Sequence, residues 1–149
     1  MDKRDLEQLL SDVAGGSITP ADALTRIQTA PTADLGFAQL DLSRGVRQGA
    51  GEVVYGAGKT AEQIAAIIEA LRDAGQERIL VTRLDSEKAA RTSELLGNDI
   101  DLGYAPNAQL ALVGGKPSPT GNGRVVVACA GTSDLPVAEE AALTAEFYG

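Results

Sequence analysis

Apolar residues recur along the chain at two spacings, which predict where helices and strands lie. The clearest helical pattern follows Thr60, where isoleucine and leucine return every third or fourth position until Gly75. Thr60 and Gln63 have the spacing of a capping box, which starts a helix. Near the N-terminus, leucines at helical spacing over residues 5–14 and Thr19-Pro20 as a helix start predict two further short helices.

Strand-like runs alternate with helices in the middle of the chain. A helix capped at Asp85 or Ser86 is predicted between the strands Ile79–Thr82 and Gln109–Val113, and it ends near Gly97. The predicted strands are Phe37–Leu40, Glu52–Tyr55, Ile79–Thr82 and Gln109–Val113. Residues 52–113 therefore read strand, helix, strand, helix, strand, which predicts a small α/β sheet.

The last third of the chain begins with a linker. Residues 114–123 are turn-forming types except for Lys116. The apolar run Val125–Ala130 then predicts a strand covered on both faces in a parallel sheet, and a helix starts near Pro136. One strand and one helix bury no core of their own, so we expect sequence beyond Gly149 to complete this unit, or the unit to pack on the preceding sheet.

The 149 residues suit one ordinary domain with a full core and a small additional part. The fold class is α/β: a small N-terminal α/β domain followed by the first strand–helix unit of a doubly wound parallel sheet. The predicted parts are a helical hairpin or arm (1–30), the α/β domain (31–113), the linker (114–123) and the start of the second domain (124–149).

Composition narrows the chemistry and the compartment. The chain has no histidine and one cysteine, which removes the usual general base and makes a zinc site untenable; magnesium remains possible through carboxylates and phosphates. A net charge of −8 opposes non-specific nucleic-acid binding. With no apolar run of membrane length, no signal-peptide pattern and a single cysteine, we expect a cytoplasmic protein without a membrane partner.

Gly58-Lys59-Thr60 lies between a predicted strand and a predicted helix, as in a phosphate-binding P-loop. That motif requires a glycine five positions before Gly58, where Val53 stands. The alternative is that the glycines form the turn and Thr60 caps the helix, while Lys59 contributes a point charge to an anionic ligand.

Arg44 and Arg47 are a second candidate anion site, because on a helix they share one face. Two arginines can clamp a carboxylate or phosphate. On spacing alone, ion pairs with Asp41 and Glu52 explain them equally well.

Gly131-Thr132-Ser133-Asp134 is the most informative stretch, because it joins the predicted buried strand to the start of a helix. Ligands of open α/β sheets bind at such positions, where helix N–H groups hold phosphates. Thr132 and Ser133 offer hydroxyl donors, while Asp134 would accept from ribose hydroxyls or cap the helix. Cys129 is predicted to be a small buried hydrophobe rather than a nucleophile.

Two separated motifs resemble a known family. The stretch Ala130–Ala141, Ala-Gly-Thr-Ser-Asp-Leu-Pro-Val-Ala-Glu-Glu-Ala, closely resembles the opening of the catalytic domain of pyridinium-3,5-biscarboxylic acid mononucleotide synthases. Asp34–Ala38, Arg47–Gly49 and Glu52–Thr60 resemble their N-terminal domain, so the likeness covers about residues 34–149. That catalytic domain is similar to aminoimidazole ribonucleotide carboxylase and mutase, in which a Gly-Ser-x-Ser-Asp turn holds the ribotide.

The resemblance implies an activity. Such enzymes carboxylate nicotinic acid adenine dinucleotide on its pyridinium ring with carbon dioxide or bicarbonate, and they cleave its phosphoanhydride to release AMP. The product is the precursor of the nickel-pincer nucleotide of lactate racemase; Mg²⁺ assists, and a homo-oligomer is expected. The residues expected to bind the dinucleotide are Asp41, Arg44, Arg47, Lys59, Gly131, Thr132, Ser133 and Asp134.

The sequence also departs from the family. Its cysteine nucleophile comes late in the catalytic domain, so it is expected beyond Gly149, and Cys129 does not match it. Leu42 and Ser43 stand where histidines often follow Asp41. We therefore expect an N-terminal portion that is inactive alone. The alternative is a non-catalytic regulatory domain that binds an adenine nucleotide.

Overall fold

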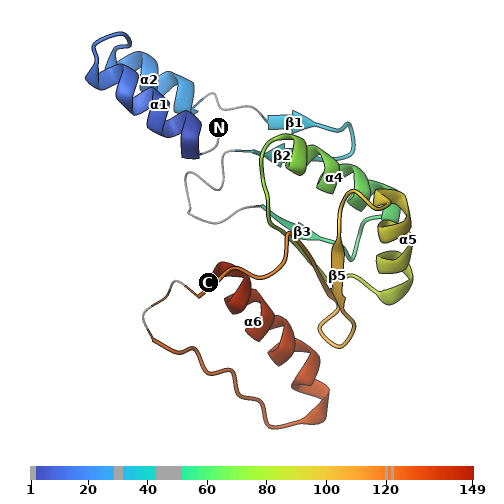
Figure 1. The fold of residues 1–149 in the computed structure, drawn as a ribbon. Coiled ribbons are helices and arrows are strands. Elements are labelled where there is room, and N and C mark those ends of the chain that lie inside the picture. The colour runs from blue at the N-terminus through green and yellow to red at the C-terminus, as the bar shows by residue number, and fades with distance from the viewer. Residues whose placement is uncertain (1–2, 29–31, 43–51, 120, 122) are drawn as a thin grey trace. The chain divides into compact units, whose positions relative to one another are not determined.

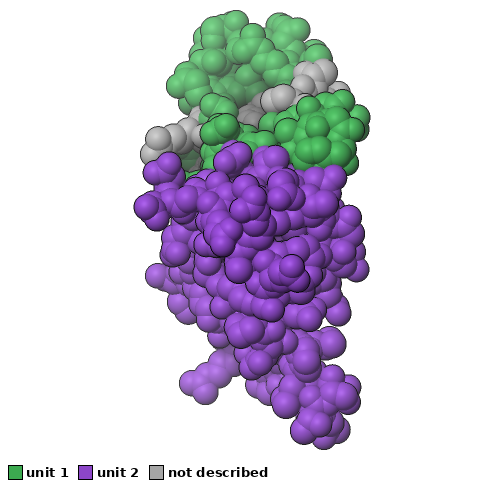
Figure 2. Space-filling model, turned by 90° about the vertical axis from the view of Figure 1, so that its right-hand side faces the viewer, with its two compact units in different colours: residues 1–52, 70–76 green, residues 53–69, 77–149 purple. Residues whose placement is uncertain are grey.

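The computed structural model describes residues 3–28, 32–42, 52–119, 121 and 123–149 (Figure 1). They fall into two compact units (Figure 2). The first unit comprises residues 1–52 and 70–76, and the second comprises residues 53–69 and 77–149. In the described residues, each helix is too short or too polar to cross a membrane.

The first unit begins with the two predicted helices, α1 (Lys3–Ala14) and α2 (Pro20–Gln28). The predicted cap is confirmed, because the Thr19 hydroxyl oxygen accepts the Asp22 N–H at 3.1 Å. Leu9 of α1 and Ala23 of α2 are the buried side chains of this helical pair.

An antiparallel strand pair follows, formed by β1 (Thr32–Asp34) and β2 (Gln39–Asp41). The sequence predicted a strand at Phe37–Leu40, whereas β2 begins two residues later and ends one residue later. The Asp34 carboxylate accepts the Gly36 N–H at 2.7 Å and the Leu35 N–H bonds the Ala38 carbonyl, so the turn occupies these positions. Phe37 therefore lies in the turn, and nearly half of its surface is exposed.

The second unit contains a four-stranded sheet of order β3-β4-β6-β5, which confirms the α/β class. Its strands are β3 (Val53–Tyr55), β4 (Ile79–Thr82), β5 (Leu102–Ala105) and β6 (Leu110–Val113). The β3–β4 pair is parallel and the other two pairs are antiparallel. Three strands lie where the sequence predicted them, and β5 is additional.

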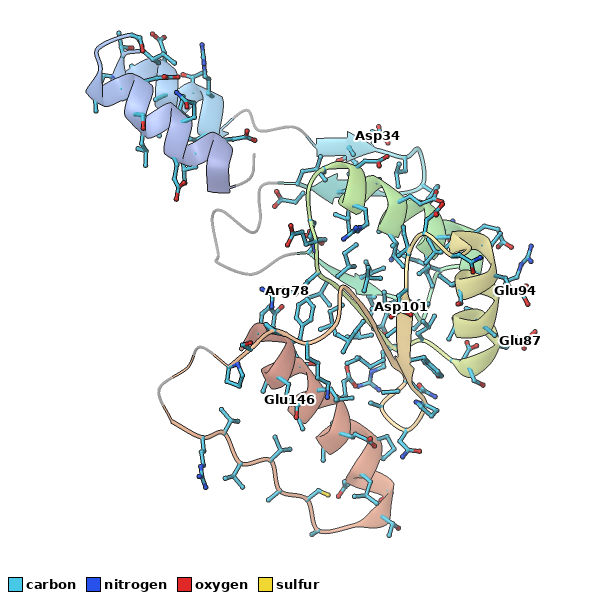
Figure 3. The ribbon with its side chains drawn as sticks, viewed as in Figure 1. Asp34, Arg78, Glu87, Glu94, Asp101 and Glu146 are labelled. Carbon is cyan, nitrogen blue, oxygen red and sulfur yellow. The ribbon has the colours of Figure 1, made fainter. Side chains whose placement is uncertain are left out.

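The helices α4 (Ala61–Asp73) and α5 (Ser86–Leu96) confirm their predicted starts. The Thr60 hydroxyl accepts the Gln63 N–H, and the Gln63 side chain accepts the Thr60 N–H, which completes the capping box. Asp85, rather than Ser86, caps α5: its carboxylate accepts the Lys88 N–H at 2.8 Å. On α5, Glu87 and Glu94 project away from the sheet (Figure 3).

The final helix is α6 (Leu135–Tyr148), preceded by the single turn η1 (Thr132–Asp134). Phe147 of α6 packs in a core cluster with Leu80 and Leu110 of the sheet, and Leu143 joins the edge of that cluster. The helix therefore packs on the sheet of its own unit, on the face opposite α5 (Figure 1).

The predicted buried strand at Val125–Ala130 is wrong. Residues 124–130 form no ladder with any strand in the described part of the chain, and Figure 1 shows them as an extended trace beside α6. Val125 is 78% exposed and Val126 is 85% exposed. A strand exists only where a neighbouring strand accepts its hydrogen bonds, and the edges β3 and β5 do not pair with this segment. Cys129, predicted to be buried, is exposed for the same reason.

Candidate functional site

The turn at the start of α6 carries four of the predicted site residues. Within it, the Asp134 N–H bonds the Gly131 carbonyl at 3.0 Å, and Thr132, Ser133 and Asp134 are exposed. Asp134 occupies the cap position of α6, but its side chain makes no capping hydrogen bond. Asp134 was predicted either to cap the helix or to accept a hydrogen bond from a ligand. The capping bond is not formed, and the ligand role stays a prediction.

Two polar groups converge above Gly131. A methyl group placed on Gly131 would lie 3.4 Å from a carboxylate oxygen of Asp134 and 3.5 Å from the hydroxyl of Ser133. Gly131 has an ordinary extended backbone (φ −114°, ψ 151°), so no conformational strain requires glycine there. The turn thus offers a small open space bordered by a hydroxyl donor and a carboxylate acceptor, next to helix N–H groups.

The surroundings of this turn differ from the prediction. The preceding segment is exposed rather than a buried strand, so the rule that ligands bind at the ends of parallel strands does not support this position. The argument for a site rests instead on the helix N-terminus and on the two side chains above Gly131.

The only parallel strand pair of the described residues, β3–β4, has its own cluster at the carboxyl edge. The ammonium of Lys59 is folded back on the Tyr55 carbonyl at 3.0 Å. At the start of α4, the pKa of Glu62 is lowered by a hydrogen bond from its own backbone N–H and by the Thr60 hydroxyl. The capping box and this carboxylate occupy the helix start, which disfavours a phosphate there and argues against the P-loop interpretation.

Lys88 is a central residue of this edge that sequence reasoning missed. Its ammonium lies 3.1 Å from the Gly56 carbonyl, 3.5 Å from that of Ala57 and 3.2 Å from the Asp85 carboxylate. The Lys88 backbone N–H, followed by its ammonium, lowers the pKa of Asp85. Lys88 therefore ties the loop after β3 to the loop after β4.

Arg83 links the same edge to α6. It has a left-handed backbone (φ 55°), which is unfavourable for a residue with a side chain, and its guanidinium pairs with Glu140 at 3.2 Å. Two hydrogen bonds hold the backbone of the adjacent Leu84. Its N–H donates to the Gln109 carbonyl, and the Tyr104 hydroxyl donates to the Leu84 carbonyl. Burial, aided by the charge of a nearby carboxylate, raises the pKa of Tyr104.

The remaining predicted site residues belong to different parts of the chain. Asp41 lies half-buried at the end of β2 in the first unit, whereas Lys59 and the Gly131–Asp134 turn belong to the second. Arg44 and Arg47 lie outside the described residues. In the described part of the chain, no hydrogen bond or ion pair joins Lys59 to the turn.

No group of three or more histidine, cysteine, aspartate or glutamate side chains is placed to hold an ion among the residues that the structure describes.

Comparison with known proteins identifies the family. The LarB/PurE-like N-terminal domain matches residues 32–114, more than half of the chain, including the whole four-stranded sheet. No curated protein matches the chain at a significant level. A LarB/PurE-like domain indicates a carboxylase- or mutase-type enzyme family. The chain therefore belongs to the family of the LarB/PurE-like N-terminal domain.

Proposed function

We propose that the protein carrying this chain carboxylates nicotinic acid adenine dinucleotide on its pyridinium ring and cleaves the phosphoanhydride to release AMP. Its product would be the precursor of the nickel-pincer nucleotide. The proposal rests on the family match together with one structural observation, the uncapped turn Gly131–Asp134 at the start of α6.

The turn offers what a nucleotide needs. The Ser133 and Thr132 hydroxyls donate to phosphate oxygens, and the helix dipole adds favourable charge at the same point. The Asp134 carboxylate accepts from ribose hydroxyls. Lys59, Arg44 and Arg47 are the proposed cationic partners, because a net charge of −8 requires that any attraction for an anion be local.

The overall reaction balances without assigning a nucleophile to this chain. Carboxylation replaces a ring hydrogen by a carboxylate and releases one proton, and water adds across the phosphoanhydride. In the family that the sequence resembles, a cysteine nucleophile makes the pyridinium ring electron-rich enough to attack carbon dioxide. Cys129 does not match the position of that cysteine. Magnesium remains a proposed cofactor.

Binding of the dinucleotide to the full chain, measured by titration calorimetry, tests the site. Losing a hydrogen bond to a charged group costs roughly 1.5–3 kcal/mol, so Ser133→Ala should weaken binding about tenfold or more. Ser93→Ala, at an exposed serine of α5, is the matched control and should bind like the parent. Asp134→Ala should weaken binding without lowering the melting temperature, because its side chain makes no cap. Parent-like binding by Ser133→Ala and Asp134→Ala would remove the site assignment.

A second assay separates catalysis from regulation. With labelled bicarbonate and magnesium, the complete enzyme should transfer label to the ring and release AMP. A regulatory adenine-nucleotide domain would bind AMP as tightly as the dinucleotide and would release none.

A further inference from the structure

A cavity of about 260 Å³ lies on the face of the sheet that packs against α6. Its apolar lining comes from Leu110 and Leu112 of β6, Ala105 of β5 and Leu143 of α6. The cavity is smaller than the roughly 300–1,000 Å³ pockets that hold drug-sized ligands, so it suits one small molecule rather than a dinucleotide. The turn Gly131–Asp134 contributes no residue to the described lining.

Gly103 keeps this cavity open. It lies inside β5, directly opposite Leu112 in the strand register, so a side chain there would point to the same face as that of Leu112. An added methyl group would make one ordinary contact with the described residues, 3.6 Å from the Leu112 carbonyl. The φ of Gly103 lies outside the left-handed region, so the backbone does not require glycine. Glycine weakens a strand, and within strands it often marks the close approach of a ligand.

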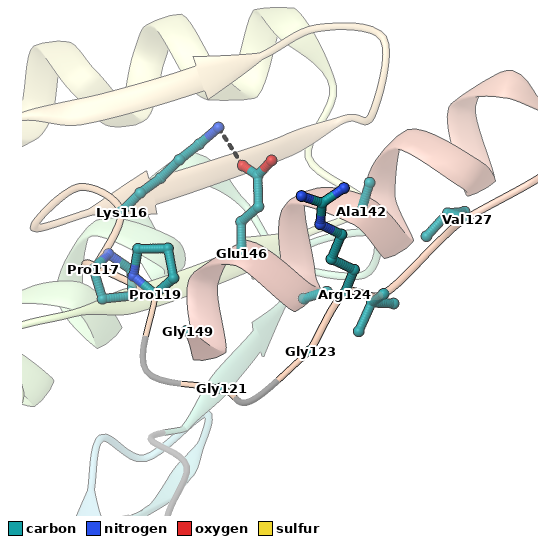
Figure 4. A pocket seen from close by; sticks show the side chains of 12 residues that line it. Lys116, Pro117, Pro119, Gly121, Gly123, Arg124, Val127, Ala142, Glu146 and Gly149 are labelled. Carbon is teal, nitrogen blue, oxygen red and sulfur yellow. Dashed lines mark ion pairs between the residues drawn. The ribbon is translucent and has the colours of Figure 1, made fainter.

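A carboxylate and an ammonium group border the cavity at one end of the sheet. Leu102 pairs with Val113, so the start of β5 lies beside the end of β6, and Asp101 comes near Lys116. These two are the charged residues of the described lining. Lys116 also pairs with Glu146 of α6 (Figure 4), and its ammonium has three N–H donors, so donors remain for a ligand.

Charges of both signs beside an apolar cavity select a ligand that carries both. Lys116 would attract a simple carboxylate but Asp101 would repel it, and a simple amine would meet the reverse. We propose that this cavity binds a free α-amino acid with a branched aliphatic side chain, such as leucine. Its ammonium group pairs with Asp101, its carboxylate accepts from Lys116, and its side chain enters the apolar space. This inference does not rest on the proposed function.

Titration calorimetry of the full chain with L-leucine tests the chemistry of the ligand. We expect saturable binding. Isocaproate, which lacks the ammonium group, and leucinamide, which lacks the carboxylate, should each bind several-fold more weakly, since ion pairs near the surface contribute modestly. Free glycine should bind at least tenfold more weakly, because it buries no side chain. No binding of L-leucine at about 10 mM, or equally tight binding of either analogue, would overturn the proposal.

Variants of the lining test the position of the ligand. Gly103→Val should weaken L-leucine binding at least tenfold, because its side chain would fill the cavity, and valine suits a strand. Asp101→Asn should weaken binding several-fold with an unchanged circular dichroism spectrum, because that side chain is exposed. Asp99→Asn is the matched control, an exposed carboxylate outside the lining. Parent-like binding by folded Gly103→Val or by Asp101→Asn, or an equal loss in Asp99→Asn, would overturn the proposal.

Heteronuclear NMR locates the ligand without any substitution, so a Gly103→Val chain that failed to fold would not leave the question open. L-leucine should shift the amide signals of Gly103 and Gly115, which both line the cavity, and leave that of Gly131 in place. Shifts at Gly131 without shifts at Gly103 and Gly115 would contradict the assigned position.

Discussion

Replacement of Gly131 by alanine should make the chain more stable and its proposed ligand binding weaker. Because the backbone there is extended (φ −114°, ψ 151°), alanine fits without strain, and its smaller unfolded-state entropy should add about 0.4–1 kcal/mol of stability. Its methyl group would fill the space 3.4 Å from the Asp134 carboxylate and 3.5 Å from the Ser133 hydroxyl. A phosphate or ribose oxygen could then no longer reach both groups.

The magnitude follows from the hydrogen bonds that the methyl group displaces. One bond to a charged group is worth roughly 1.5–3 kcal/mol, so the dissociation constant for the dinucleotide should rise about 10- to 150-fold. Urea unfolding gives the stability and calorimetry gives the affinity. Gly103→Ala, in β5, is the matched control, because a methyl group there makes only an ordinary 3.6 Å contact with the Leu112 carbonyl.

The two measurements must move in opposite directions for Gly131→Ala and not for the control. If Gly131→Ala bound the dinucleotide as tightly as the parent, the space above Gly131 would not be a binding space. A loss of affinity that accompanied a loss of stability would indicate a disturbed turn, and it would equally refute the reasoning.

Three further outcomes concern stability. Gly114→Ala should lower the free energy of unfolding, measured in urea, by about 2–5 kcal/mol, because its methyl group would overlap the Glu77 carbonyl and the backbone there is left-handed. Gly115→Ala adds only the strain of a left-handed backbone and should cost about 1–2 kcal/mol. Equal costs would contradict this reasoning. Thr92→Val should stabilise the fold by up to about 1 kcal/mol, since the buried Thr92 hydroxyl has no hydrogen-bond partner among the described residues; marked destabilisation would reveal one. The pKa of Asp85 is lowered in the folded chain, so its charge stabilises the fold above about pH 4, and this stabilisation is lost as pH falls through the folded pKa. The difference in unfolding free energy between the parent and Asp85→Asn should therefore shrink in acid. A difference that does not change with pH would argue against this.

Sequence reasoning located the helices well because their end signals are local. The Thr60–Gln63 box lies within four residues and needs no tertiary context. Gly75 ends α4 in the same way: it has φ 86°, its N–H bonds the Arg72 carbonyl, and the next N–H bonds that of Leu71. Such bonds form wherever the chain folds locally.

Strands were harder because pairing is not local. β1 and β5 have only three and four residues and no alternating pattern, so nothing marks them before their partners are known. Val125–Ala130 shows the converse: it has the local properties of a strand, but it pairs with no strand in the described part of the chain.

The candidate site was predicted in part, for a similar reason. The sequence placed Gly131–Asp134 at a helix start, which the structure confirms, whereas ligand binding by this turn stays a prediction. Lys88 and Arg83 were not predicted, because only the parallel pairing of β3 with β4 brings them to one edge of the sheet. Helix spacing alone makes Lys88 an ordinary surface residue.

The order β3-β4-β6-β5 has a consequence for synthesis on the ribosome. β4 emerges before α5 and before β6, the antiparallel partner that covers one of its edges. Translation at roughly 5–20 residues per second leaves the apolar strand Ile79–Thr82 without that partner for seconds. The β5–β6 hairpin, by contrast, can close within about 1–10 μs of its release. The nascent chain thus presents an apolar edge to chaperones from the emergence of β4 until β6 emerges.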